Sequence, residues 1–173
     1  PKGDWSFQLR DTFTLGNQAP NVASEQVFVR INNDVGATLG IPPGGRVLQA
    51  FLSANYQIRD IQGLEELNRD QITLNARGIY KFLPKTTLLL DIDYRLLLYD
   101  TPVRVVSEDL SLTNSNSSPL RITGGLNGLV APRISLILTA GYGFSQYDSG
   151  LQVEGLDGLL AQVEGSLFFG PKA

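Results

Sequence analysis

The sequence contains no cysteine, no histidine and no methionine. Without cysteine the chain has neither a disulfide framework nor a thiolate metal site. Without histidine it lacks the commonest general base and metal ligand. The usual catalytic and phosphate-binding motifs are also absent. We therefore expect that the protein is not an enzyme and has no catalytic residue, no metal and no cofactor.

Charge and long apolar runs are also scarce. Only 18% of the residues are charged and the net charge is -3, which argues against a nucleic-acid partner. No apolar run approaches the roughly 18 residues of a membrane-spanning helix. The 173 residues suffice for one domain, expected to span residues 1–173.

What the sequence does contain is regular alternation, seen most clearly in residues 72–100. Apolar and polar side chains exchange at every residue on both sides of Pro84-Lys85, and this period of two predicts two strands joined by a tight turn. Each run exceeds the usual strand length of about 5 to 6 residues. It also covers the roughly 9 to 11 residues with which a tilted strand crosses a bilayer. We therefore expect a transmembrane β-hairpin.

The same alternation recurs along the whole chain. Short turns at Pro42, Pro84, Pro132 and Pro171 alternate with long connections, of which residues 101–119 form the longest loop. Aromatic residues near the strand ends fit interfacial girdles. The sequence thus predicts an all-β, antiparallel, up-and-down transmembrane β-barrel of about eight strands. The strands are expected at residues 4–15, 27–41, 46–59, 72–82, 88–98, 120–130, 134–144 and 159–169.

The alternation also assigns side chains to the two faces of the barrel wall. The residues expected to line the lumen are Arg10, Arg30, Asp34, Arg59, Arg77, Asp91, Asp93, Arg95, Arg121 and Glu164. The residues expected to face lipid are Leu74, Leu88, Leu90, Ile92, Leu96, Leu136, Leu138 and Val163.

Asp91 and Asp93 lie two residues apart and therefore point to the same side of their strand. Such a pair could serve as an acid/base pair or hold a cation. Arg95 follows on the same face and Arg77 could oppose the carboxylates across the hairpin. We favour an ion-pair network in the lumen over either form of chemistry.

Three segments carry a resemblance to a known family: RDTFT at residues 10–14, YKFLPKTTLLLDIDY at 80–94 and LVAPRISLILTAGYGFSQYD at 129–148. With them the chain resembles outer-membrane β-barrel porins encoded beside exopolysaccharide synthesis and export genes. The resemblance implies a place in the bacterial outer membrane and contact with its lipids. It also implies polysaccharide or small polar solutes as partners, and it brings no catalytic residues.

We further expect these residues to be a fragment of a longer barrel. Pro1-Lys2 and Pro171-Lys172 repeat the internal turn at Pro84-Lys85, and family members are longer than this chain. Many small side chains on the polar face, such as Thr12 and Ser53, favour a lumen wider than eight strands enclose. Both edges would then pair with missing strands or with other copies.

The sequence leaves three functions open. The first is a pore or export conduit for polar solutes or polysaccharide. The second is a structural outer-membrane protein with a plugged lumen that anchors a larger assembly. The third is a soluble β-sandwich or lipocalin-like binding module, because such folds also alternate polar and apolar residues.

Overall fold

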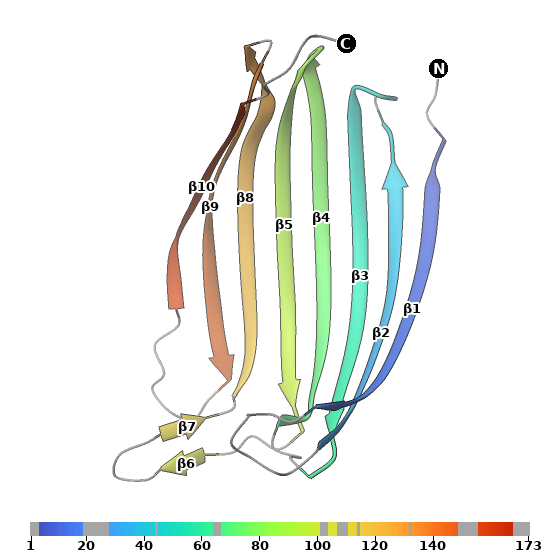
Figure 1. Ribbon diagram of the computed structural model, residues 1–173, viewed down its shortest axis with the longest axis vertical. Helices are drawn as coiled ribbons and strands as arrows, with labels where there is room; N and C mark the ends of the chain where they lie inside the picture. Colours follow the sequence, from blue (N-terminus) through green and yellow to red (C-terminus); the bar gives the residue numbers. More distant parts are fainter. Residues whose placement is uncertain are drawn as a thin grey trace.

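The computed structural model describes residues 4–18, 28–43, 45–63, 67–100, 104–106, 111–113, 115–131, 133–148 and 156–167. These residues form an all-β fold dominated by one sheet of eight antiparallel strands (Figure 1). The strand order is β1-β2-β3-β4-β5-β8-β9-β10, so sequence neighbours lie side by side throughout. The expected all-β, antiparallel, up-and-down architecture is therefore confirmed. The eight strands are β1 Ser6–Gln18, β2 Phe28–Ile41, β3 Leu48–Ile61, β4 Arg69–Leu83, β5 Thr86–Tyr99, β8 Asn116–Ala131, β9 Ile134–Asp148 and β10 Leu156–Leu167.

The long loop expected at residues 101–119 is the main correction. This stretch contains a small two-stranded sheet formed by β6 (Arg104–Val106) and β7 (Ser111–Thr113), and β8 already begins at Asn116. Residues of β8 that have low strand propensity, such as Asn116 and Ser117, pair with the end of β9. Pairing with a neighbouring strand overrides local propensity here.

Short turns lie at one end of the sheet and long connections at the other (Figure 1). We call these the turn end and the loop end. Leu83 pairs with Thr86, which leaves Pro84-Lys85 as a two-residue turn. In the turn between β2 and β3, Gly45 has a φ of 65°, a backbone conformation that glycine adopts without strain. The expected turns at Pro132 and Pro171, the repeated Pro1-Lys2 and the last residues of the expected strand 159–169 lie outside the described residues.

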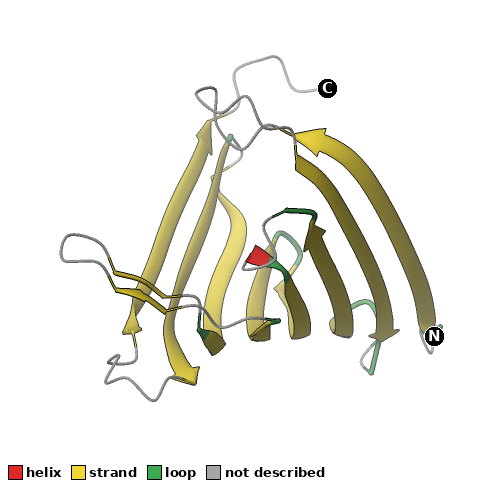
Figure 2. Cartoon of the chain, turned by 90° about the horizontal axis from the view of Figure 1, so that it is seen from below, coloured by secondary structure: helices red, strands yellow, loops and turns green. Residues whose placement is uncertain are grey.

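The sheet is curved but not closed. β1 and β10 occupy opposite edges and do not pair with each other. Both edges bend toward the same side, which gives the sheet the form of an open trough (Figure 2). An open, curved sheet of long up-and-down strands is consistent with part of a larger barrel.

The sheet is a single layer without a core of its own. Among the described residues no hydrophobic side chain is buried. In the same part of the chain, no helix is long and apolar enough to cross a membrane. The apolar side chains of the sheet are therefore exposed.

Candidate functional site

The register of the strands places side chains on two faces. Residues directly opposite in an antiparallel pair point to the same side of the sheet. Asn75 pairs with Asp93, and Asp93 pairs with Arg121, so these three polar residues share a face. Applied across the sheet, the register gathers every residue expected in the lumen on this one face, and each residue expected to face lipid on the other. Whether these faces meet a lumen and lipid stays a prediction.

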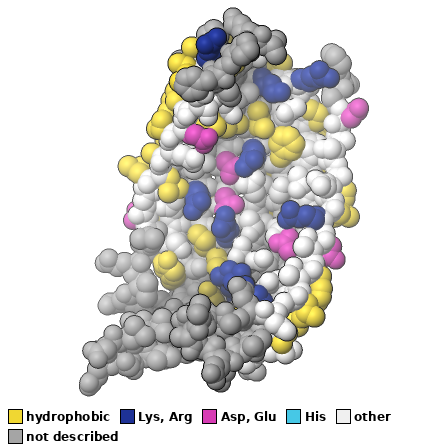
Figure 3. Space-filling model, in the orientation of Figure 1, with side chains coloured by type: hydrophobic (Ala, Val, Ile, Leu, Met, Phe, Trp, Pro, Cys, Tyr) yellow, Lys and Arg dark blue, Asp and Glu magenta, His cyan; other side chains and the backbone are white. Residues whose placement is uncertain are grey.

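The polar face is the concave one. Lysine, arginine and acidic side chains run along the middle of the face seen in Figure 3, with apolar side chains mostly toward its margins. This face is turned toward the inside of the trough (Figures 1 and 2). Exposure follows the curvature along β3, where Ser53, Asn55 and Gln57 are half-buried and the alternating Leu52 and Tyr56 are exposed. Side chains on a concave surface crowd one another, and those on a convex surface spread apart.

The two adjacent aspartates of β5 take part in ion pairs on the concave face. Asp91 accepts a hydrogen bond of 2.7 Å from Arg77 Nε and one of 3.0 Å from Asn75 Nδ2. Asp93 accepts one of 2.7 Å from Arg95 Nε on the same strand. These hydrogen bonds occupy both carboxylate oxygens of Asp91 and one of Asp93. The arrangement therefore favours an ion-pair network over an acid/base pair.

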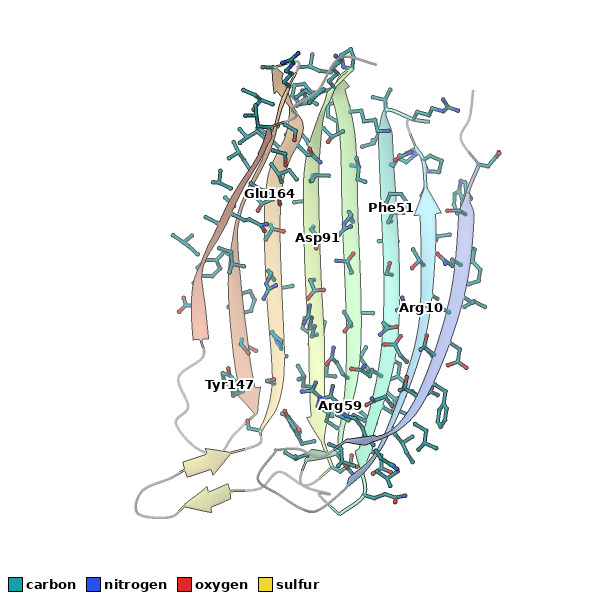
Figure 4. All side chains as sticks on the ribbon, viewed as in Figure 1. Arg10, Phe51, Arg59, Asp91, Tyr147 and Glu164 are labelled. Carbon is teal, nitrogen blue, oxygen red and sulfur yellow. The ribbon has the colours of Figure 1, made fainter. Side chains whose placement is uncertain are left out.

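A second group of polar contacts joins the first three strands of the sheet. Asp34 accepts hydrogen bonds from Arg10 at 3.2 Å and from Asn55 Nδ2 at 2.9 Å, and the hydroxyls of Thr38 and Ser53 are 3.1 Å apart. Polar contacts thus link β1, β2 and β3 across the concave face, and Figure 4 labels Arg10 among them. In the part of the chain that the structure describes, no group of three or more acidic residues could hold a metal ion.

Two further residues expected in the lumen, Arg121 and Glu164, are not among the partners in these hydrogen bonds. Arg121 pairs in register with Asp93 and Gly143 and lines a hollow of the concave face together with Arg95 and Tyr147. Glu164 lies on β10 toward the turn end, opposite Ile137 (Figure 4). The glycines of this hollow leave it open beside the charged side chains.

The sequence alone missed part of a cationic group at the loop end. Arg30 and Arg59 were expected on this face, but Arg69 fell in a segment interpreted as loop. In the structure Arg69 begins β4 and lies directly opposite Arg59. Arg69, Gln71 and Thr73 follow one another at a spacing of two, which continues the alternation of the strand, and this signal could have found Arg69.

The convex face is apolar along most of each strand and acidic at its loop end. On this face Asp60, Asp70 and Asp157 lie at the loop ends of β3, β4 and β10, next to the apolar residues of these strands. Asp70 accepts a 2.7 Å hydrogen bond from the Tyr56 hydroxyl, and Asp157 accepts one from Tyr142. The apolar surface is therefore a band with a polar border. The expected lipid-facing residues on it are Leu74, Leu88, Leu90, Ile92, Leu96, Leu136, Leu138 and Val163.

No family model, no curated protein and no solved structure matches the chain. Its function is therefore inferred from the two faces of the sheet. A concave face lined with charges can bind or conduct polar solutes. An apolar convex face needs a lipid or protein environment to cover it.

Proposed function

We propose that this chain forms part of the wall of a transmembrane β-barrel in the bacterial outer membrane, which acts as a pore or export conduit for polar solutes or polysaccharide. The observation that carries the proposal is the inverted polarity of the trough. A soluble barrel fills its interior with apolar side chains or an apolar ligand and turns polar side chains to water. A membrane barrel has the opposite arrangement, with polar side chains inside and an apolar band outside.

The height of the apolar band supports a bilayer. On β3 the convex side chains are apolar from Leu48 to Ile58 and end at Asp60. At a rise of about 3.3 Å per residue this stretch is about 33 Å long. A strand tilted by about 40° then spans about 25 Å along the membrane normal, which is the height of the apolar band in outer-membrane barrels.

The exposure of the central strands supports the same environment. Leu52, Leu74 and Leu90 have strands on both flanks and are still 48%, 47% and 51% exposed. An apolar surface spread over all eight strands is far larger than the few hundred Å² that soluble monomers usually expose. Lipid acyl chains would cover such a surface without a specific partner.

The edges of the sheet set a further requirement. β1 and β10 each have one neighbour in the sheet, so the outer backbone groups of both strands lack a strand partner within the described residues. Unpaired backbone groups in hydrocarbon cost several kcal/mol each. We therefore propose that further strands of the same protein, or other copies of it, complete the barrel.

The two alternative functions, a soluble binding module and a structural barrel, predict a different fold or a different permeation. A soluble β-sandwich requires a second layer and a packed apolar core, and the described residues form a single layer without buried apolar side chains. A structural barrel with a plugged lumen shares the two faces and differs only in permeation. The export of polysaccharide is proposed from the resemblance of residues 80–94 and 129–148 to porins encoded with exopolysaccharide genes.

Two measurements test the proposal. The full-length protein, expressed in a Gram-negative host, should float with outer-membrane vesicles and remain with them after a carbonate wash. The purified protein should then give stepwise ion conductance in planar bilayers. Recovery as a detergent-free soluble protein would contradict the membrane proposal. Membrane insertion without conductance would favour the structural alternative.

A further inference from the structure

We propose that Arg30, Arg59 and Arg69, the arginine cluster, form a binding site for an oxyanionic group of a solute, such as the carboxylate of an acidic sugar or a phosphate. This inference deepens the proposed pore function. A role of the arginine cluster in permeation rests on the proposed pore, whereas anion binding by the cluster does not.

The cluster brings three cations together on adjacent strands. Arg59 of β3 and Arg69 of β4 are direct cross-strand partners. Arg30 of β2 is the diagonal neighbour of Arg59, because Asn32 is the residue directly opposite Arg59. Arg30 and Arg69 both lie close enough to repel the Arg59 guanidinium. Like charges placed directly opposite each other destabilise a sheet, so the facing pair of Arg59 and Arg69 opposes folding unless an anion joins it.

The carboxylates nearest in sequence point away from the cluster. Asp60 and Asp70 each follow one of these arginines, and strand alternation turns them to the convex face. There Asp60 accepts a hydrogen bond from Asn68 and Asp70 accepts one from Tyr56.

The next row of cross-strand pairs on the concave face contains Asp34, which lies opposite Gln57. Its carboxylate also has other partners. Asp34 binds Arg10 and Asn55. Among the described residues, the ion pairs join Arg10, Arg77 and Arg95 to aspartates, and neither Arg59 nor Arg69 takes part in one. The two arginines therefore keep their charge available on the concave face.

The donors themselves are partly withdrawn from solvent. The Nε atoms of Arg59 and Arg69 are buried and have no hydrogen-bond partner in the described part of the chain. A buried charged donor without a partner is costly, and an anion that accepts its hydrogen bond would remove that cost. Tyr99 lies directly opposite Arg69 on the same face and offers a hydroxyl donor beside the guanidinium groups.

The chemistry of the donors selects the ligand. Guanidinium groups are planar and offer parallel N–H bonds that match a carboxylate or a phosphate. A neutral sugar cannot use the charge. Arg59 lies near the loop end of the trough (Figure 4), so in a barrel the cluster would lie near one mouth, where an anionic solute would enter or leave.

Binding is tested on the full-length protein in a non-ionic detergent, by calorimetric titration with inorganic phosphate, trigalacturonate and maltotriose. Phosphate and trigalacturonate are expected to bind, and the neutral maltotriose is not. In Arg59→Gln with Arg69→Gln the dissociation constants for both anions should rise about tenfold or more. Lys85→Gln with Arg133→Gln removes the same number of charges at two short turns and should leave both constants unchanged. If wild-type protein binds the anions no better than maltotriose, or if the double variant binds them as well as wild type, the site does not exist.

Thermal unfolding separates a ligand site from a structural role. Without anion, Arg59→Gln should melt above wild type because it relieves repulsion, whereas Arg77→Gln should melt below it because Asp91 loses its partner. Adding phosphate should raise the melting temperature of wild type more than that of Arg59→Gln. A lower melting temperature for Arg59→Gln without anion would overturn the proposal. Because these measurements need no bilayer, a protein that conducts no ions could still bind anions, and the two proposals can fail separately.

Discussion

Leu89 and Leu90 are neighbours on β5 whose side chains point to opposite faces, Leu89 to the concave face and Leu90 to the convex one. An arginine on the lipid face of a barrel costs about 2 to 4 kcal/mol at mid-depth. We expect Leu90→Arg to lower the free energy of unfolding by about this amount, and Leu89→Arg to lower it by less than about 1 kcal/mol because its charge faces water. Urea titration of both variants in lipid vesicles measures the difference. Equal losses at the two positions would contradict the assignment of the faces.

Gly141 and Gly143 both lie on the concave face of β9 but have different surroundings. A Cβ at Gly141 would meet the carbonyl oxygen of Ile122 and lie 2.6 Å from Thr123 Cγ2, whereas the nearest atom at Gly143 is Leu160 Cδ1 at 3.5 Å. We expect Gly141→Ala to destabilise the protein by about 1 to 3 kcal/mol, because β8 must shift to make room. Gly143→Ala should be neutral or slightly stabilising, since it restricts the unfolded chain. Denaturant midpoints of the two variants provide the comparison, and equal midpoints would show that the close approach at Gly141 is relieved at little cost.

At the residue scale, the sequence predicted the face of a side chain much better than its partner. Alternation alone put Asp91, Asp93 and Arg77 on one face because the period of a strand is two. It could not tell that Arg95 binds Asp93 on its own strand while Arg77 binds Asp91 across the hairpin. That choice depends on side-chain rotamers and register, which are set by neighbouring strands.

At the scale of the element, β5 allows the depth of the apolar band to be measured. Its convex side chains run from Leu88 near the turn end to Leu98, which lies opposite Asp70 at the polar border. The cost of a charge in a barrel wall falls from about 2 to 4 kcal/mol at the midplane to about 0 to 1 kcal/mol near the interface.

We therefore expect Ile92→Arg to be costly and Leu98→Arg to be tolerated, because Asp70 lies beside the new cation. Unfolding free energies in vesicles of one lipid thickness give the profile along the strand. A flat profile would mean that no hydrocarbon layer surrounds the convex face.

Element existence was predictable here, whereas element ends were not. Each of the eight expected ranges overlaps a strand of the main sheet, because long alternating runs leave one interpretation. β3 and β4 extend into the acidic segment interpreted as loop, to Ile61 and from Arg69. Polar residues predict loops by propensity, but hydrogen bonding to a neighbouring strand decides the ends, and the cluster at Arg69 was missed for that reason.

At the scale of the whole molecule, the described residues of the concave face include more cationic than acidic side chains. Lumenal charges set the ion preference of a pore. We expect an open pore to favour anions weakly, and Arg77→Glu combined with Arg121→Glu to reverse that preference. Reversal potentials across a potassium chloride gradient measure it, at low ionic strength where screening is weak.

The control for this prediction makes the same change of charge on the short turns. Lys85→Glu combined with Arg133→Glu alters two of the short turns and leaves the concave face intact. This variant should keep the anion preference of wild type. Reversal potentials that respond equally to both pairs of changes would mean that net charge, rather than an arginine-lined path, governs permeation.

The strand order of the main sheet has a consequence for how the molecule forms and how it could change in size. Within the described sheet every strand pairs with the strand before or after it, and only the small β6–β7 sheet interrupts the series. Such local pairing keeps contact order low for a β protein, so each hairpin closes at a small cost in loop entropy. The sheet can therefore assemble one hairpin at a time, and the gain or loss of a hairpin at an edge would change the circumference without altering any existing pair.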